Sequence, residues 1–268
     1  MASWHEMAEM TSREFGEAKP EIRIALIPVG ATEQHGPNLA LATDYVIAHR
    51  LCQRLAERLH PRAVVVPPIP FGISHHHTGF PGTVTISAET FLALMFDVAR
   101  SLKANGIRHL LFVNGHNGNN AILNVATTKI RYELEVEAAT AFWFQQAADR
   151  VKAHARTPRY GHACEIESSV LMALAPNLVR QDALEAGDMI ESPLKLAFNN
   201  QPFFLQVPVP FHEQTRNGAF GDARLATPEI GEDIVRVAVE RMAEFAEAFI
   251  AERDRSAAGR GAAPDALS

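Results

Sequence analysis

Residues 87–131, SAETFLALMFDVARSLKANGIRHLLFVNGHNGNNAILNVATTKIR, contain the pattern that decides the fold. Ser87 is a typical helix N-cap, and apolar residues then recur at helical spacing until Asn105-Gly106, a typical helix end. The run Ile107–Val113 has no helical spacing, which indicates a buried strand, and a second helix is expected over Asn120–Arg131. This stretch therefore predicts a helix, a strand and a helix in succession.

The same alternation continues on both sides of this stretch. Short apolar runs predict buried strands, and apolar residues spaced by three and four predict amphipathic helices. We predict strands at 22–29, 63–66 and 135–143, and helices at 45–59, 166–174 and 230–253. Strands that alternate with helices of this length favour an α/β fold, with a mostly parallel sheet covered on both faces.

The 268 residues are enough for one large domain or two small ones, and one α/β domain accounts for the predicted elements most simply. We assign this domain to residues 1–255. The stretch 177–227 is rich in Pro, Asn, Gln and Phe, so we expect an excursion from the domain or a subunit contact there. Residues 256–268, SAAGRGAAPDALS, offer little to bury and are expected to be disordered.

The charge and cysteine content exclude several classes of protein. With 25 basic against 31 acidic residues, the net charge of −6 gives no field that would hold a nucleic acid. No apolar run reaches the length of about 18 residues that a membrane span needs, and acidic residues stand where a signal peptide has basic ones. The two cysteines, Cys52 and Cys164, form no CxxC pair. We therefore expect a cytoplasmic protein that binds neither nucleic acid nor membrane.

The 12 histidines are unevenly spread, and several of them follow predicted strands. In an open α/β sheet the ligand crevice lies beyond the carboxyl ends of the strands, so the loops at those ends are examined first. Four such loops, at 30–37, 74–83, 114–120 and 161–169, carry histidines, in two cases together with carboxylates. The candidate ligands in these loops and just after the first of them are Glu33, His35, Asp44, His116 and Glu167.

This donor set contains oxygen and nitrogen but no thiolate, which suits Zn²⁺ or Mn²⁺ in a catalytic site. Glu33 and His35 are two residues apart, so an extended loop would point both side chains the same way. A carboxylate such as Asp44 can bridge, which would allow two ions about 3.5–4 Å apart to share one water or hydroxide. The set therefore favours a catalytic metal site over a structural one.

Each of these residues also has an ordinary interpretation. Asp44 alone would be the N-cap of the helix at 45–59, and His116 a hydrogen-bonded turn residue. The run His75–His77 is also consistent with an exposed loop that binds metals adventitiously. Cys164, beside His162, is a packing residue or, alternatively, a nucleophile. The functional interpretation depends on the coincidence that separate loops, each after a predicted strand, carry potential ligands.

Four ordered motifs, GATEQHGPNLALATD, HTGFPGTVTIS, NGHNGNN and HACEIESS, resemble those of the creatininase (creatinine amidohydrolase) family. The resemblance spans about residues 22–250. It implies a three-layer α/β/α fold with a mostly parallel central sheet, commonly assembled as a homohexamer, and a two-metal centre that hydrolyses C–N bonds of small amides. The same family includes formamide hydrolases of flavin and deazaflavin biosynthesis and a peptidase of mycofactocin maturation.

The resemblance also implies a metal site built from named residues. Glu33 and His116 would bind one divalent ion, His35 and Glu167 would bind the other, and Asp44 would bridge the two. The ions would be zinc, manganese or one of each, with iron as a further candidate.

Other roles follow from the same motifs. His162 opens the last motif and would be the acid/base histidine, which takes a proton from water and passes it to the leaving nitrogen. Glu167 holds the place of the ligand glutamate in that motif, with Glu165 as the alternative. The substrate cavity would be lined by Ser74, His77, Asn117 and Gly118.

The departures from the family concern the substrate. Creatininase has a tyrosine and a metal-binding glutamate after the NGH histidine, where this chain has Asn117 and Gly118, and its substrate-enclosing tryptophans are not evident here. Creatinine is therefore not the expected substrate. We predict an amidohydrolase that cleaves a small cyclic amide, ureide or formamide by metal-activated hydroxide. The alternatives are a metal-dependent lactone or phosphoester hydrolase and a non-catalytic metal-binding protein.

Overall fold

A parallel sheet forms the centre of the computed structural model, which describes residues 5–191 and 208–259. The sheet has five strands in the order β1-β3-β2-β4-β5, and each neighbouring pair is parallel. The strands are β1 (His5–Glu6), β2 (Ile24–Val29), β3 (Ala63–Val65), β4 (His109–Asn114) and β5 (Glu137–Phe142).

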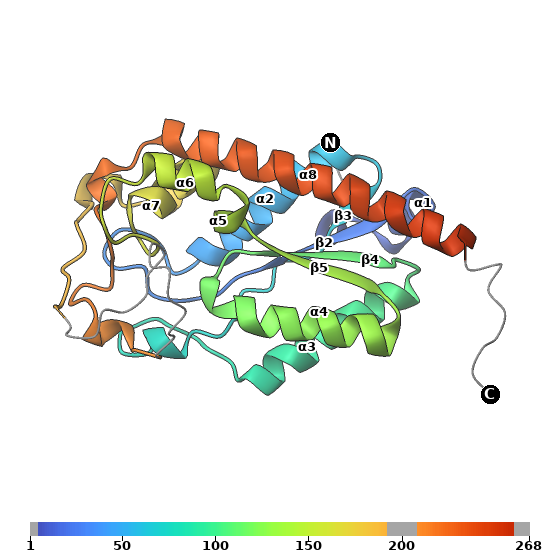
Figure 1. Ribbon diagram of the computed structural model, residues 1–268, viewed down its shortest axis with the longest axis horizontal. Helices are drawn as coiled ribbons and strands as arrows, with labels where there is room; N and C mark the ends of the chain where they lie inside the picture. The colour runs from blue at the N-terminus through green and yellow to red at the C-terminus, as the bar shows by residue number, and fades with distance from the viewer. Residues whose placement is uncertain (1–4, 192–207, 260–268) are drawn as a thin grey trace.

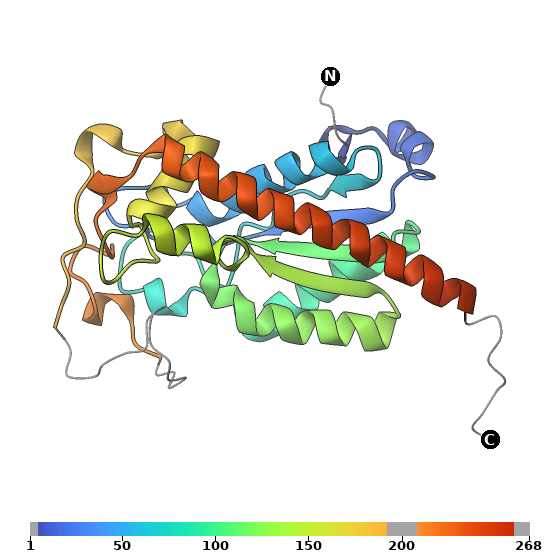
Figure 2. The same ribbon diagram turned by 45° about the horizontal axis from the view of Figure 1, so that its top comes forward.

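Helices cover both faces of this sheet, so the fold has three layers (Figures 1 and 2). One face carries α2 (Thr43–Leu59), α7 (Glu165–Leu174) and the long α8 (Pro228–Gly259), and the other carries α3 (Ala88–Ala104) and α4 (Asn120–Leu134). The shorter helices are α1 (Ser12–Ala18), α5 (Trp143–Gln146) and α6 (Ala148–His154). Single 3-10 turns occur at Met7–Glu9, His75–His77, Asn117–Asn119, Pro176–Leu178, Gln181–Ala183, Phe211–Glu213 and Ala223–Leu225.

Strand β2 shows why both faces are covered. All six of its residues are buried, and successive side chains point to opposite faces of the sheet. Ile24 and Leu26 belong to the core cluster that includes residues of α2, α7 and α8, whereas Ala25, Ile27 and Val29 belong to the cluster with α3 and α4. A strand buried on two sides has no polar face, and this explains its continuous apolar sequence.

The predicted α/β/α architecture is confirmed, and each predicted strand and helix is present with ends that differ by a few residues. Elements β1, α1, α5 and α6 were not predicted, because each is too short to show a clear period. Helix α8 continues to Gly259, beyond the predicted domain boundary at 255. Residues 260–268 of the predicted disordered tail lie outside the described residues, as do residues 192–207 within the predicted excursion.

The connections after the strands bring the candidate site together. The loop after β2 leads into α2, and the loop after β4 leads into α4, so both run out from the carboxyl end of the sheet, to the left in Figure 1. In the described part of the chain, no helix combines the length and the apolar character that crossing a membrane requires.

Candidate metal centre

Asp44 lies at the centre of a buried group of carboxylates and imidazoles. It stands in the first turn of α2 and its two oxygens face different histidines: Oδ1 lies 3.2 Å from His35 Nε2, and Oδ2 lies 3.2 Å from His116 Nδ1. The residue before the helix is Ala42, and no side chain caps this end. The alternative that Asp44 is an N-cap is therefore wrong.

The first half of the group surrounds Oδ2 of Asp44. Oε1 of Glu33, from the loop after β2, lies 3.2 Å from the same Nδ1 of His116, so two carboxylates meet one ring nitrogen. The other ring nitrogen, Nε2, lies 3.0 Å from the carbonyl oxygen of Ile73, to which it can only donate. Nδ1 is therefore the nitrogen that faces the carboxylates, and it is the one that a metal ion could take in place of a proton.

The second half surrounds Oδ1 of Asp44. Nε2 of His35 lies 3.5 Å from Oε2 of Glu167, which stands in the first turn of α7. Nδ1 of His35 lies 3.2 Å from the carbonyl oxygen of Glu33, so this ring also donates from the nitrogen that faces away from the carboxylates. Glu167 Oε2 accepts a hydrogen bond of 2.6 Å from the backbone N–H of Ala163, which fixes the carboxylate. Asp44 is the side chain that faces both imidazoles, one from each half.

Several polar atoms of this group have no hydrogen bond. Glu33 Oε2, His35 Nε2 and Asp44 Oδ2 are buried and lack a hydrogen-bond partner among the residues that the structure describes. The carboxylates of Glu33, Asp44 and Glu167 form ion pairs with histidines, and none of them pairs with a described lysine or arginine. Unpaired lone pairs and buried negative charge are costly. Divalent cations at these atoms would compensate both, and an oxygen and nitrogen donor set fits zinc or manganese.

The pKa shifts describe the same need for positive charge. Burial raises the pKa of Glu33. Although burial opposes it, Glu167 and Asp44 raise the pKa of His35 well above its ordinary value, and Glu33 and Asp44 do the same to His116. The pKa of Asp44 is lowered despite its burial, chiefly by His35. The electrostatic field of the group thus favours any cation, whether proton or metal.

The fold brings Asp44 and His116 together through a close backbone approach. A Cβ atom on Gly115 would lie 2.0 Å from the carbonyl oxygen of Asp44, so only glycine allows the end of β4 to meet the start of α2. The side chain of Asn114 fixes the backbone of His116, because it accepts a hydrogen bond from His116 N at 3.0 Å and donates one to His116 O at 2.6 Å.

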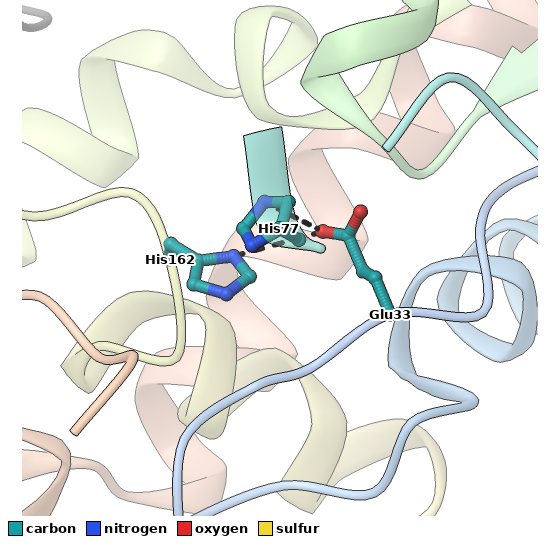
Figure 3. Close-up of side chains that lie close together, drawn as sticks. All are labelled: Glu33, His77 and His162. Atoms are coloured by element: carbon teal, nitrogen blue, oxygen red, sulfur yellow. Dashed lines mark ion pairs between the residues drawn. The ribbon is translucent and has the colours of Figure 1, made fainter. Parts of the chain in front are cut away.

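His77 and His162 both point toward the carboxylate of Glu33 (Figure 3). His77 Nε2 lies 3.2 Å and His162 Nδ1 3.9 Å from Oε1 of Glu33. The two rings pack against each other with centroids 4.5 Å apart. Burial lowers the pKa of His162 well below its ordinary value, which favours the neutral form of the ring. A neutral imidazole beside the group can accept a proton.

The remaining predicted residues lie near the group in different ways. Ser74 is buried, with Oγ 3.4 Å from His116 Nε2, the nitrogen that faces away from the carboxylates. Gly118 leaves room for that ring, because a Cβ atom there would lie 2.3 Å from the same nitrogen. The side chain of Asn117 is exposed and accepts a hydrogen bond of 2.8 Å from Asn120. The substrate-binding roles of these residues stay predictions.

Glu165 does not join the group. Its carboxylate accepts hydrogen bonds from the backbone of Arg156, Thr157 and Asp222, at 3.0–3.1 Å, and from the Thr157 hydroxyl at 2.7 Å. These bonds tie the loop that carries His162 to the segment around residue 222. Of the two glutamates in the motif, only Glu167 therefore lies beside a candidate ligand.

Sequence reasoning missed three side chains of the site. Gln34 is buried between the rings of His77 and His162. Phe211 packs against His77 and His162, with centroids 4.0 and 4.7 Å away, and stacks on Phe220 at 4.6 Å. A neutral glutamine gives no metal-ligand signal, although its place between Glu33 and His35 could have been noticed. The two phenylalanines come from a stretch without a regular period.

Comparison with known proteins identifies the family of the chain. The family model for creatininase, creatinine amidohydrolase, matches residues 8–246. A mycofactocin precursor peptide peptidase of Mycobacterium ulcerans is 37% identical over 190 residues, which are 68% of this chain and 70% of that protein. The creatinine amidohydrolase of Pseudomonas putida is 27% identical over 261 residues, 89% of this chain and 94% of that protein.

The fold matches in the same way. A solved structure of a creatinine amidohydrolase-like protein from Bacteroides fragilis superposes with a TM-score of 0.79 at 27% identity, covering 93% of this chain and 98% of that chain. The matched region contains all four motifs and the whole buried group. The predictions of the family and of a hydrolase class within it are thus confirmed: the chain belongs to the creatininase family.

Proposed function

We propose that the protein is a two-metal amidohydrolase, with Glu33, His116 and Asp44 at one ion and His35, Glu167 and Asp44 at the other. The observation that carries this proposal is the placement of Asp44, whose two oxygens each lie 3.2 Å from a different imidazole nitrogen. A carboxylate between two sets of ligands is the arrangement that binuclear hydrolytic centres use. Zinc and manganese are the ions proposed, with iron as a further candidate.

The ions would supply Lewis acidity, which activates water for attack and polarises the carbonyl oxygen of the amide. The protein residues supply the proton transfers. Burial favours the neutral form of His162, and its Nδ1 lies on the side of Glu33, so this nitrogen can accept the proton that water loses as the C–O bond forms. The same proton then passes to the amide nitrogen as the C–N bond breaks, so His162 returns to its neutral form.

The proposed substrate is a small amide, namely a cyclic amide, ureide or formamide. The centre is closely enclosed, because Phe211 covers His77 and His162 and the six candidate ligand and acid/base residues are all buried. A small substrate could reach such an enclosed site with less movement of the surrounding side chains than a large one. A second candidate, a peptide bond, is favoured by the 37% identity to the mycobacterial peptide peptidase.

The other hydrolase chemistry fits less well. A phosphoester hydrolase would place fixed positive charge beside its metal centre, whereas the carboxylates here pair with histidines among the described residues. The leaving nitrogen of an amide needs a proton more strongly than the leaving oxygen of a lactone does. The position of His162 beside Glu33 therefore favours the amide.

Assembly and location are proposed from different observations. We propose a homohexamer on the family resemblance alone. We propose a cytoplasmic location because both cysteines are free and buried, which agrees with a reducing compartment.

The experiment is metal analysis followed by a substrate screen. Purified protein is reconstituted with zinc or manganese, its bound metal is counted, and hydrolysis of cyclic amides, ureides, formamides, short peptides, lactones and phosphoesters is measured. Two ions per chain and amide hydrolysis are expected. Fewer than one ion per chain after reconstitution, with no hydrolysis in any class, would overturn the proposal.

A further inference from the structure

Gln34 is buried at the point where His77 and His162 meet. Its side-chain nitrogen lies 2.8 Å from His77 Nδ1, 3.0 Å from His162 Nε2 and 3.1 Å from the carbonyl oxygen of Gly218. An amide nitrogen carries only two hydrogens, so it can donate to two of these three atoms. The choice between them determines where the hydrogens of both histidines lie.

Backbone groups fix the orientation of this amide. Oε1 of Gln34 accepts a hydrogen bond of 2.9 Å from the N–H of Gly36, and Nε2 faces the carbonyl oxygen of Gly218. If the amide were turned over, the NH₂ group would face a backbone donor and the oxygen would face a backbone acceptor. The orientation with Nε2 toward the histidines is therefore the only one that satisfies both backbone groups.

The hydrogen on His162 follows from its own backbone partner. Nε2 of His162 lies 2.9 Å from the carbonyl oxygen of Gln34, and a carbonyl oxygen can only accept. Nε2 therefore carries a hydrogen and has no lone pair for the Gln34 amide, although the two nitrogens are close. The amide then donates its two hydrogens to Gly218 O and to Nδ1 of His77.

The hydrogen on His77 follows in turn. Because Nδ1 of His77 accepts from Gln34, its hydrogen lies on Nε2, which is 3.2 Å from Oε1 of Glu33. His77 is then a donor to the carboxylate of Glu33 and has no lone pair left for a metal ion. Nδ1 of His162 is the lone pair that remains, and it lies toward Glu33 at 3.9 Å.

We propose that Gln34 is a positioning residue whose side-chain amide sets the hydrogen positions of His77 and His162, so that one donates to Glu33 and the other presents a lone pair to the reacting water. The catalytic consequence rests on the proposed amidohydrolase function, whereas the hydrogen positions do not. Gly218 leaves room for the Gln34 amide, because a Cβ atom on Gly218 would lie 2.1 Å from Gln34 Oε1. Its backbone φ of +80° also favours glycine.

The direct test is neutron diffraction from deuterium-exchanged crystals of the metal-loaded protein. We expect deuterium on Nε2 of both His77 and His162 and none on either Nδ1. Deuterium on Nδ1 of His77 would overturn the proposal. The map is informative even if no amide is hydrolysed, so a failure of the proposed function and a failure of this proposal are distinguishable.

Kinetics of two variants supply the second test. Gln34→Met keeps most of the volume but removes both donors, and Gly218→Ala displaces the amide. In both, kcat should fall by about 10- to 100-fold, as for partners that orient functional groups, while bound metal stays at the wild-type level. The matched controls are Gln181→Met, at an exposed glutamine, and Gly16→Ala, where a Cβ atom meets nothing within 4 Å. A Gln34→Met variant with kcat within about twofold of wild type would show that Gln34 only fills space.

Discussion

Nδ1 of His116 lies 3.2 Å from Oδ2 of Asp44, yet the Asp44 oxygen has no hydrogen bond among the described residues. The two atoms face each other as paired ligands do, and His116 directs its other nitrogen at a backbone carbonyl. The opposite oxygen of Asp44, Oδ1, lies at the same distance from His35 Nε2, and this pair of contacts is the basis of the two-metal interpretation.

Asp44→Asn should remove bound metal from both halves of the centre. Asparagine keeps the shape of the side chain but loses the charge and one acceptor oxygen, and both proposed ions share this carboxylate. Metal counting after reconstitution should give well under one ion per chain, with turnover lost. Asp97→Asn is the control, because Asp97 is exposed on α3 and pairs with Arg100 on the surface. Two ions retained in Asp44→Asn would contradict the bridging role.

Glu165→Gln should lower the stability of the protein, whereas Glu167→Gln should lower its metal content. Glu165 accepts four hydrogen bonds at a buried position, and an amide would turn its NH₂ group toward some of those donors, so a stability loss of about 1–3 kcal/mol is expected. Its bound metal should be unchanged. Glu167→Gln should instead lose metal from the half that contains His35.

The measurements are urea unfolding for stability and metal analysis for occupancy. Because the two residues lie within one turn of α7, each variant is the control for the other. Metal loss in Glu165→Gln with full occupancy in Glu167→Gln would reverse the assignment.

His162→Ala should separate metal binding from turnover. The ring faces Glu33 at 3.9 Å but is assigned to proton transfer, so bound metal should persist while kcat falls by roughly 10²–10⁴-fold. His154→Ala is the control, since that partly exposed ring pairs with Asp233 of α8. Unchanged turnover in His162→Ala would show that another group transfers the proton.

The thiols should be inert in the folded protein. Burial raises the pKa of Cys164 to about 12, so at pH 8 the group is a neutral thiol rather than a thiolate. Burial also raises the pKa of Cys52 well above its ordinary value. A chromogenic disulfide reagent at pH 8 should detect no thiol in the native protein and two after unfolding in urea. Rapid native labelling of Cys164 would revive the alternative that it is a nucleophile.

The fold could be predicted largely because the three central strands of its sheet, β3, β2 and β4, are buried along their whole length. A run such as Ile24–Val29 has no polar position, so it is recognisable without any periodicity. The two-residue strand β1 and the seven-residue helix α1 could not be recognised, because each is too short to show a clear apolar period. The end of α8 was set too early, since composition alone does not show where a helix stops.

The candidate site was predictable where chemistry identifies the residue type. Carboxylates and imidazoles after strands pointed to Glu33, Asp44 and His116, and in the structure one oxygen of each carboxylate lies 3.2 Å from His116 Nδ1. Gln34 gave no such signal, because its importance depends on rings that come from distant loops. Phe211 was missed for the same reason, since contacts between distant segments leave no local pattern.

Anomalous diffraction from crystals grown with manganese or zinc tests the central claim most directly. Two anomalous peaks about 3.5–4 Å apart should lie on either side of the Asp44 carboxylate, one beside Glu33 and His116 and the other beside His35 and Glu167. A single peak, or a peak between Glu33, His77 and His162, would contradict the two-metal account.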